Sequence, residues 1–350
     1  MPSVSFTIAD VFSTTSYKGN PLAIVDAREE TLTDTQLKLI TRQFNLSETT
    51  FFFPPTSPKT DFKLRSFLPD GKEVIGAGHN ILGVWWHLAQ ANLLPLPAPQ
   101  AADENFVFHQ ELGGQVMPVR VTRHTSAAAA APDDLDNNNK SNEVSFSVSI
   151  RQATPHAHAT HPDPTGLALS LGLKAEDIGF EGLPPQVMST STTRHLLVPL
   201  SSVAALNQVT VAGREAVLAQ LRRADNAAYG LYLFTPEARD NDGEGTANTR
   251  AFQARFFSPG MSGEDPATGS AAGPLAAYLY RHGALKVDGR GAGKIIVRQG
   301  LRVGRECVIE VELCVGKKED GEEVVEVDLV GSGVQVAEGR IAVPDVSTQF

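Results

Sequence analysis

The chain contains the same local pattern twice. Residues 65–88 read RSFLPDGKEVIGAGHNILGVWWHL, and residues 255–279 read RFFSPGMSGEDPATGSAAGPLAAYL. Both copies run from Arg-x-Phe-x-Pro through a Gly-rich polar turn into a predicted helix that begins with small residues. The copies differ in their polar groups, because the first has His79 at its turn and the second has Asp265 and Ser270. A duplicated scaffold with unlike polar groups at matched positions predicts one cleft between two half-molecules.

The order of the predicted secondary structure repeats as well. Each half is expected to contain strands, a first helix, the Arg-x-Phe-x-Pro strand, a second helix and further strands. The first helix is indicated by the capping box of Thr33 and Gln36 in one half and by residues 214–223 in the other. The second helices, at about 78–91 and 268–282, are apolar on most faces, which is typical of buried helices. We therefore predict an α+β fold of two pseudo-symmetric lobes, each a curved, mostly antiparallel sheet or barrel wrapped around a central helix.

Composition divides the chain near its middle. Residues 124–143 read HTSAAAAAPDDLDNNNKSNE, a low-complexity polar sequence that is typical of an exposed insertion. We therefore predict an N-terminal lobe over residues 1–123 and a C-terminal lobe over residues 144–350, with final strands that can cross back to the first lobe. Residues 152–165, with three histidines among prolines, are predicted to form a solvated loop, and residues 237–249 a hairpin tip.

Charge and composition narrow the possible partners. The formal net charge is −10 and no basic stripe is present, which disfavours a nucleic-acid partner. No stretch approaches the ~18 apolar residues of a membrane span, and the sequence MPSVSFTIADVF lacks the basic flank of a signal peptide. Two cysteines without CxxC spacing favour a reducing, cytoplasmic location. The three histidines lie in a predicted loop rather than on a rigid frame, so no metal site is expected.

Two predicted helix starts are candidate anion sites. The segment GEDPATGSAAG leads directly into a helix, so the backbone N–H groups of Gly269 and Ser270 are expected to be free to bind a carboxylate or phosphate. The segment AGHNILG presents a second helix start, with His79 in its first turn. The alternative is ordinary capping, in which Asp265 closes its own helix. Two such turns at matched positions of a repeat favour a ligand site.

Glu48 is a further candidate, because it stands in the segment NLSETT at a predicted helix-to-strand turn before three phenylalanines. An apolar wall raises the pKa of a carboxyl group, which suits a general acid/base near neutral pH, while a solvent-exposed turn glutamate fits the same spacing. Asn20 in GNPLAIV offers an amide that either binds a substrate carboxylate or makes the turn. Arg65 and Arg255 are either anion ligands or partners of surface acids.

These motifs together resemble one protein family. GNPLAIV, NLSETTF, R-x-F-x-P…GAGH and EDPATGSAAG, in this order and spacing, are similar to the phenazine-biosynthesis isomerase (PhzF-like) family, as is the later segment QGLRVGRECVIEV. The resemblance implies a two-lobed diaminopimelate-epimerase-like fold, a homodimer and no cofactor. The type enzyme of the family moves a proton within trans-2,3-dihydro-3-hydroxyanthranilate.

The resemblance also implies roles for individual residues. Carried over by motif, Glu48 is the general acid/base, and His79, Asp265 and Ser270 complete the catalytic set by positioning the substrate and assisting proton movement. The remaining candidates are the substrate-binding residues Asn20, Ser47, Gly78, Thr268 and Gly269.

Three functions are compatible with these residues. The leading one is a cofactor-independent isomerase that acts on a small carboxylated metabolite by general acid/base proton transfer in an interlobe cleft. The second is a two-base epimerase that uses Glu48 and Asp265, and the third is a non-catalytic, small-molecule-binding member of the family. An acid/base retained with its neighbours favours an enzyme. Asn80 and Ile81 stand where bacterial members commonly have Pro and Thr, which leaves the substrate open.

Overall fold

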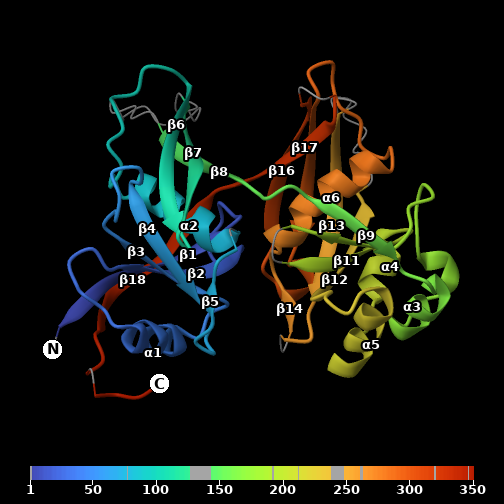
Figure 1. Ribbon diagram of the computed structural model, residues 1–350, viewed down its shortest axis with the longest axis horizontal. Helices are drawn as coiled ribbons and strands as arrows, with labels where there is room; N and C mark the ends of the chain where they lie inside the picture. The colour runs from blue at the N-terminus through green and yellow to red at the C-terminus, as the bar shows by residue number, and fades with distance from the viewer. Residues whose placement is uncertain are drawn as a thin grey trace, which may run out of the picture.

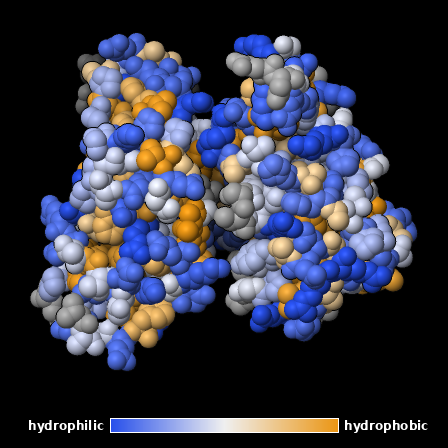
Figure 2. All heavy atoms as spheres, viewed as in Figure 1, coloured by the Kyte–Doolittle hydropathy of each residue, from blue (hydrophilic) through white to orange (hydrophobic). Residues whose placement is uncertain are grey.

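Two lobes lie side by side in the computed structural model (Figure 1). The structure describes residues 2–76, 78–126, 143–190, 193–211, 213–237, 248–260, 263–318, 321–345 and 347–350. Most of the predicted insertion, residues 127–142, and most of the predicted hairpin tip, residues 238–247, lie outside these described residues. On the face shown in Figure 2, a furrow separates the two lobes.

The first half of the chain carries two helices among its strands. Its elements are β1 (Ser3–Val11), β2 (Asn20–Asp26), α1 (Asp34–Phe44), β3 (Thr49–Phe53), β4 (Phe62–Phe67), β5 (Glu73–Val74), α2 (His79–Gln90), β6 (Asp103–Leu112), β7 (Gln115–Ser126) and β8 (Glu143–Arg151). The predicted capping box is present at the start of α1, where the Thr33 side chain accepts from the backbone of Gln36 and the Gln36 side chain accepts from the backbone of Thr33.

The second half has additional short elements. Its elements are β9 (His156–Thr160), α3 (Pro164–Ser170), η1 (Ala175–Asp177), β10 (Gln186–Ser189), β11 (Arg194–Pro199), α4 (Val203–Gln208), α5 (Arg214–Ala224), β12 (Gly230–Pro236), β13 (Thr249–Phe257), β14 (Glu264–Asp265), α6 (Gly269–Arg281), β15 (Ala292–Gln299), η2 (Leu301–Val303), β16 (Cys307–Lys317), β17 (Glu323–Gly331) and β18 (Gly333–Ala342).

The strands of the two halves pair in the same order. In the first half, β2 pairs parallel with β3, and β3 pairs antiparallel with β4. Strand β4 then pairs parallel with β6, and β6, β7 and β8 follow one another as antiparallel neighbours. In the second half, β11, β12, β13, β15, β16 and β17 repeat that order and those directions. Each parallel pair needs a crossover connection, and the helices supply it. The predicted α+β class with mostly antiparallel strands is therefore observed.

Strands also join the lobes. β8 pairs with β7 of the first lobe and, near its end, with β17 of the second, where Arg151 lies opposite Asp328. The last strand, β18, pairs antiparallel with β1, so the end of the chain lies in the first lobe beside its beginning (Figure 1). These pairings fix the two lobes relative to each other along a continuous backbone ladder.

The two central helices are buried, as their apolar faces predict. In α2, Trp85 is fully buried, and a Cβ added at Gly83 would come within 2.6 Å of Val11 and 2.7 Å of Leu22, so α2 packs closely on β1 and β2. In α6, every residue over 271–279 is buried. Tight packing at native density holds the start of each helix in a defined position.

One local prediction is wrong. The segment 152–165 was expected to be a solvated loop, but it contains β9, which pairs antiparallel with β10, and the start of α3. Short polar sequences such as HAHAT carry little strand signal of their own, and here the neighbouring strand supplies the pairing. Within the described part of the chain, no helix is both long and apolar enough to cross a membrane.

Candidate active site

Glu48 faces His79 across the start of the first lobe's central helix. Helix α1 ends at Phe44, and the left-handed backbone of the next residue, Asn45 (φ 51°, ψ 35°), turns the chain toward β3, so that Glu48 lies just before that strand. Oε2 of Glu48 lies 3.1 Å from Nε2 of His79, the first residue of α2. The two atoms are not aligned as a hydrogen bond, and neither has another hydrogen-bond partner among the described residues. The hydrogen-bonding capacity of both atoms is therefore unused within the described part of the protein.

Burial sets the charge states of this pair. The Glu48 side chain is only 18% exposed, so the alternative of a solvent-exposed turn glutamate does not hold. Burial raises the pKa of Glu48 to about 7, although the neighbouring Ser47 side chain opposes the rise. Burial lowers the pKa of His79 to about 4, against the charge of Asp265. Near neutral pH the pair is thus a carboxyl group that titrates and an imidazole that is uncharged.

Asp265 comes from the second lobe and is held by hydrogen bonds to both of its oxygens. Oδ2 accepts from the Thr268 hydroxyl at 2.7 Å, and Oδ1 accepts from Asn20 Nδ2 at 3.2 Å and from the Ala267 amide at 3.4 Å. Burial raises the pKa of Asp265 to about 6; the charge of Glu48 adds to the rise, while Thr268 and His79 oppose it. Helix α6 has no side-chain cap, so Asp265 does not close its own helix.

The Asn20 side chain connects the two lobes at this site by hydrogen bonds. Its Nδ2 donates to Asp265 Oδ1 at 3.2 Å and to the Ala267 carbonyl at 3.3 Å, and its Oδ1 accepts from the Ser47 hydroxyl at 3.2 Å. The side chain is 1% exposed. Both Nδ2 and Oδ1 of Asn20 are therefore hydrogen-bonded to protein. Through these bonds Asn20 orients Asp265 and Ser47, the residue next to Glu48.

Gln299 is a site residue that the sequence reasoning missed. It is fully buried at the end of β15, and its Oε1 accepts from the Thr268 amide at 3.2 Å. Its Nε2 donates to the Asp265 carbonyl at 2.7 Å and to the Thr268 hydroxyl at 3.0 Å. The available signal was a glutamine that ends the apolar strand sequence IIVRQG, because a buried polar side chain must find partners.

The two helix starts are built differently. Before α2, the amide of Gly78 donates to Asn80 Oδ1 at 3.0 Å, and Asn80 Nδ2 donates to the Gly76 carbonyl at 3.2 Å, so Asn80 closes that turn. Ile81 is fully buried in the hydrophobic core. At the start of α6, Gln152 donates to the Gly269 carbonyl at 3.0 Å. The first backbone N–H groups of an α-helix have no partner within the helix, so both starts present donors.

Ser270 lies in the first turn of α6, and its hydroxyl is 3.0 Å from Nε2 of His195. His195, on β11, is a second residue that the sequence reasoning missed, because RHLLVP reads as an ordinary buried strand. Of the predicted catalytic residues, Glu48, His79 and Asp265 are thus joined by contact or by charge, and Ser270 is joined to His195 instead.

Two further buried groups lie within the electrostatic range of Asp265. Burial, reinforced by the charge of Asp265, raises the pKa of both the Tyr232 hydroxyl and the Cys307 thiol. The Tyr232 hydroxyl has no hydrogen-bond partner in the part of the chain that the structure describes. The Cys307 thiol touches the Arg305 carbonyl at 3.3 Å. A raised pKa keeps both groups protonated near neutral pH, so neither is an anionic nucleophile.

The repeated arginines pair with acids rather than with a ligand. Arg65 binds Glu73 at 2.8 Å and Asp34 at 2.7 Å, and Arg255 binds Glu264 at 2.9 Å. Glu73 and Glu264 occupy equivalent places, in β5 and β14. Of the two predicted alternatives, pairing with acids is the one observed, and these ion pairs brace the turns that precede α2 and α6.

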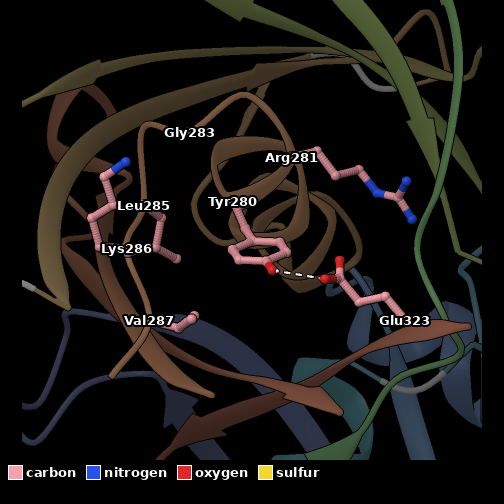
Figure 3. Close-up of a pocket in the computed structure, with 7 residues that line it drawn as sticks. All are labelled: Tyr280, Arg281, Gly283, Leu285, Lys286, Val287 and Glu323. Carbon is pink, nitrogen blue, oxygen red and sulfur yellow. Dashed lines mark hydrogen bonds between the residues drawn. The ribbon is translucent and has the colours of Figure 1, made fainter. Parts of the chain in front are cut away.

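A separate pocket lies at the other end of α6 (Figure 3). Its lining residues are Tyr280, Arg281, Gly283, Leu285, Lys286, Val287 and Glu323, and the Tyr280 hydroxyl donates to Glu323 at 3.1 Å. A rise of about 1.5 Å per residue puts this end roughly 16 Å from Ser270, so the pocket is not part of the Glu48 site. Among the described residues, no group of three or more His, Cys, Asp and Glu side chains is arranged to hold a metal ion.

Comparisons with known proteins cover nearly the whole chain. The family model described as phenazine biosynthesis-like protein, PhzC-PhzF, matches residues 9–339. An uncharacterized isomerase of Mesorhizobium japonicum is 30% identical over 97% of this chain and 99% of its own length. Trans-2,3-dihydro-3-hydroxyanthranilate isomerase of Pseudomonas aeruginosa is 27% identical over 96% of this chain and 98% of its own. The crystal structure of a Bacillus anthracis phenazine biosynthesis protein of the PhzF family has a TM-score of 0.74 at 23% identity, and the match covers 98% of this chain and all of that one.

Proposed function

The chain belongs to the phenazine biosynthesis-like (PhzF) family of isomerases, and from that premise we propose that it moves a proton within a small carboxylated molecule, with Glu48 as the general acid/base. The predicted family, the diaminopimelate-epimerase-like fold class and the assignment as an isomerase are confirmed. The proposal adds the chemistry: proton transfer by protein side chains, without a cofactor.

One observation carries the proposal, namely the state of the Glu48 carboxyl group. Its pKa of about 7 means that it accepts and returns a proton near neutral pH at little free-energy cost. Its Oε2 is buried, has no hydrogen-bond partner among the described residues and lies 3.1 Å from His79. The uncharged imidazole of His79 is placed to hydrogen-bond a substrate that lies beside the carboxyl group. Groups perturbed in this way mark functional sites more often than structural ones.

The proposed reaction conserves atoms and electrons. A C–H bond of the substrate breaks, its proton moves to Glu48 Oε2, and the bonding pair becomes part of a new double bond. An existing double bond then gives its pair to a different carbon, which takes the proton back from Glu48. Nothing is oxidised or reduced, so no redox co-reactant enters. Negative charge that develops on the substrate is stabilised by the backbone donors at the starts of α2 and α6.

The substrate class follows from those donors and from the relatives. Two helix starts at equivalent places of the repeat fit a carboxylate and a second oxygen of one small molecule. The Pseudomonas aeruginosa relative is named for trans-2,3-dihydro-3-hydroxyanthranilate, which carries a carboxylate, and we propose a substrate of that class. Asn80 closes the turn before α2 and is 2% exposed, so its influence on substrate choice would act through the shape of that turn.

A two-base epimerase is the second candidate, and one observation favours it. The pKa of Asp265 is also raised, to about 6, in part by the charge of Glu48, so a second carboxyl group titrates near neutral pH close by. In that reaction one carboxyl group takes a proton from a stereocentre and the other delivers a proton to the opposite face. Both oxygens of Asp265 are engaged by protein donors, whereas Oε2 of Glu48 is not, so the one-base isomerase is the better supported reaction.

Conversion of trans-2,3-dihydro-3-hydroxyanthranilate in D₂O tests the proposal. Protein dialysed against EDTA is incubated with this compound, and the reaction is followed by proton NMR. We expect an isomerised product that keeps part of the substrate's protium at its new carbon, because a single base returns the proton that it took. The Glu48→Gln protein reports the uncatalysed background.

Other outcomes of the D₂O reaction would contradict the proposal. Inversion at one carbon with complete deuteration would support the two-base epimerase instead. Activity that is lost with EDTA and restored by a divalent ion would contradict a cofactor-independent reaction. Binding without conversion, for this compound and for other small cyclic carboxylates, would support a non-catalytic member of the family.

A further inference from the structure

His195 contacts Ser270 at the start of α6, and the residue at the matching place of the first lobe is of a different kind. His195 is 1% exposed on β11, with Nε2 3.0 Å from the Ser270 hydroxyl. The repeat matches Phe67 with Phe257, so strand pairing matches Thr49 with Leu231 and Ala23 with Leu196. The first-lobe counterpart of His195 is therefore Leu22. The first lobe therefore has no ring at this place, and its own helix start is closed by an asparagine side chain instead.

The surroundings of His195 keep its ring uncharged. The ring of Phe256 meets it edge-on at 5.2 Å, and the ring of Tyr229 lies at 6.1 Å. Burial lowers the pKa of His195 to about 4, so the imidazole carries a single N–H near neutral pH. That N–H is on either Nδ1 or Nε2, and the two tautomers make opposite hydrogen bonds to Ser270.

The partners of the ring favour the Nε2–H tautomer. Nδ1 is buried and has no hydrogen-bond partner among the residues that the structure describes. A buried N–H without an acceptor is rarer and more costly than a lone pair without a donor. With the proton on Nε2, the ring donates to Ser270 Oγ, and the hydroxyl hydrogen of Ser270 must point elsewhere. Ser270 lies at the start of α6, so that hydrogen joins the backbone N–H groups there as a further donor.

We propose that His195 is a positioning residue that fixes the Ser270 hydroxyl as a hydrogen-bond donor to the substrate. This inference rests on the proposed function and refines its substrate class. A serine that is free to rotate would accept a hydrogen bond from an ammonium group as readily as it would donate one to an oxygen. A serine whose Oγ accepts from an Nε2–H group keeps one lone pair, but its hydroxyl hydrogen is turned away from the ring. A carboxylate or carbonyl oxygen at the start of α6 can accept that hydrogen and therefore fits this place better than an amine.

The tautomer of His195 can be observed without any substrate. Protein labelled with ¹⁵N at histidine gives ring nitrogen resonances in long-range proton–nitrogen spectra, and the His195 signals are those that His195→Gln lacks. We expect Nε2 protonated and Nδ1 unprotonated near neutral pH. A proton on Nδ1, or a charged ring, would overturn the inference. This result does not depend on catalysis, so it stands even if the proposed function fails.

Kinetics then test the role toward the substrate. In His195→Leu we expect the KM for trans-2,3-dihydro-3-hydroxyanthranilate to rise roughly 10-fold, the usual effect of one misplaced hydrogen bond, while kcat changes by less than about 3-fold. Glutamine retains a donor near the position of Nε2, so His195→Gln should restore KM to within about 3-fold of wild type. A purely structural role would not separate KM from kcat or be rescued by glutamine.

A matched control removes a buried histidine elsewhere. His161 is 3% exposed and contacts Pro185 and Asp163, away from the Glu48 site. His161→Leu should leave the KM unchanged. A wild-type KM in His195→Leu, or equal KM values in the leucine and glutamine variants of His195, would overturn the inference.

Discussion

Replacing Glu48 with glutamine is expected to lower the turnover of trans-2,3-dihydro-3-hydroxyanthranilate by roughly 10²- to 10⁴-fold, the usual contribution of a general acid/base. Glutamine keeps the shape and most of the hydrogen bonding of glutamate, but it cannot accept a proton at neutral pH. Binding should survive, because the backbone donors at the starts of α2 and α6 are unchanged. The loss is therefore expected in kcat, with the dissociation constant close to that of wild type.

The measurement compares kcat by NMR and the dissociation constant by calorimetry for wild type, Glu48→Gln and Glu30→Gln. Glu30 is an exposed glutamate in the loop before α1, so its replacement should change neither quantity. A Glu48→Gln protein with nearly normal kcat would remove Glu48 from the mechanism and leave Asp265 or His79 as the base.

The same Glu48→Gln substitution is expected to stabilise the fold at alkaline pH. Because the pKa of Glu48 rises from 4.5 to about 7 on folding, the folded protein holds this proton more tightly than the unfolded chain. The resulting stabilisation is complete below pH 4.5 and is lost as the pH rises through about 7. Glutamine has no proton to lose, so the stability of the variant relative to wild type should increase by about 2–3 kcal/mol between pH 5 and pH 8.

Urea unfolding at pH 5 and pH 8 measures this change in the free energy of unfolding. The informative quantity is the difference between Glu48→Gln and wild type at each pH, because the titration of other groups is largely shared by the two proteins. Glu30→Gln should show nearly the same difference from wild type at both pH values. A Glu48→Gln difference that does not change with pH would show that burial does not raise this pKa.

The central helices could be predicted from the sequence because their signals are local. Apolar residues on most faces predicted that α2 and α6 are buried, and the repeated motif placed their starts close to His79 and Gly269, where the structure has them. The capping box of α1 was likewise a local pattern. The local sequence also placed Glu48 next to a run of phenylalanines. Only the fold shows that the imidazole of His79 contacts the Glu48 carboxyl group.

Contacts between distant segments were not predictable in the same way. The final strands were expected only in general to cross back to the first lobe, and the residues of β18 do not single out β1 as its partner, because strand partners are set by the whole sheet. His195 became visible only when the topology placed it beside Ser270, 75 positions later in the chain. Asn20 was expected either to bind substrate or to make its turn, and the structure shows its amide between Asp265 and Ser47.

Several expectations concern properties that a single chain does not display. The homodimer, the cytoplasmic location, the absence of a cofactor and the lobe boundaries at residues 123 and 144 stay predictions. The roles of Ser47, Gly78, Thr268 and Gly269 in binding substrate stay predictions too. Thr268 also has a structural role, because its hydroxyl donates a hydrogen bond to Asp265 and accepts one from Gln299.

The most direct test of Glu48 as the proton-transferring group is a titration of its own carboxyl carbon. Protein labelled with ¹³C at the glutamate carboxyl position is followed by NMR from pH 4 to pH 9, and the Glu48 resonance is the one that Glu48→Gln lacks. We predict a midpoint of about 7, because burial disfavours the charged form of this carboxyl group. A midpoint near the ordinary value of 4.5 would mean that Glu48 is fully ionised at neutral pH and would contradict its role as a group that both accepts and returns a proton.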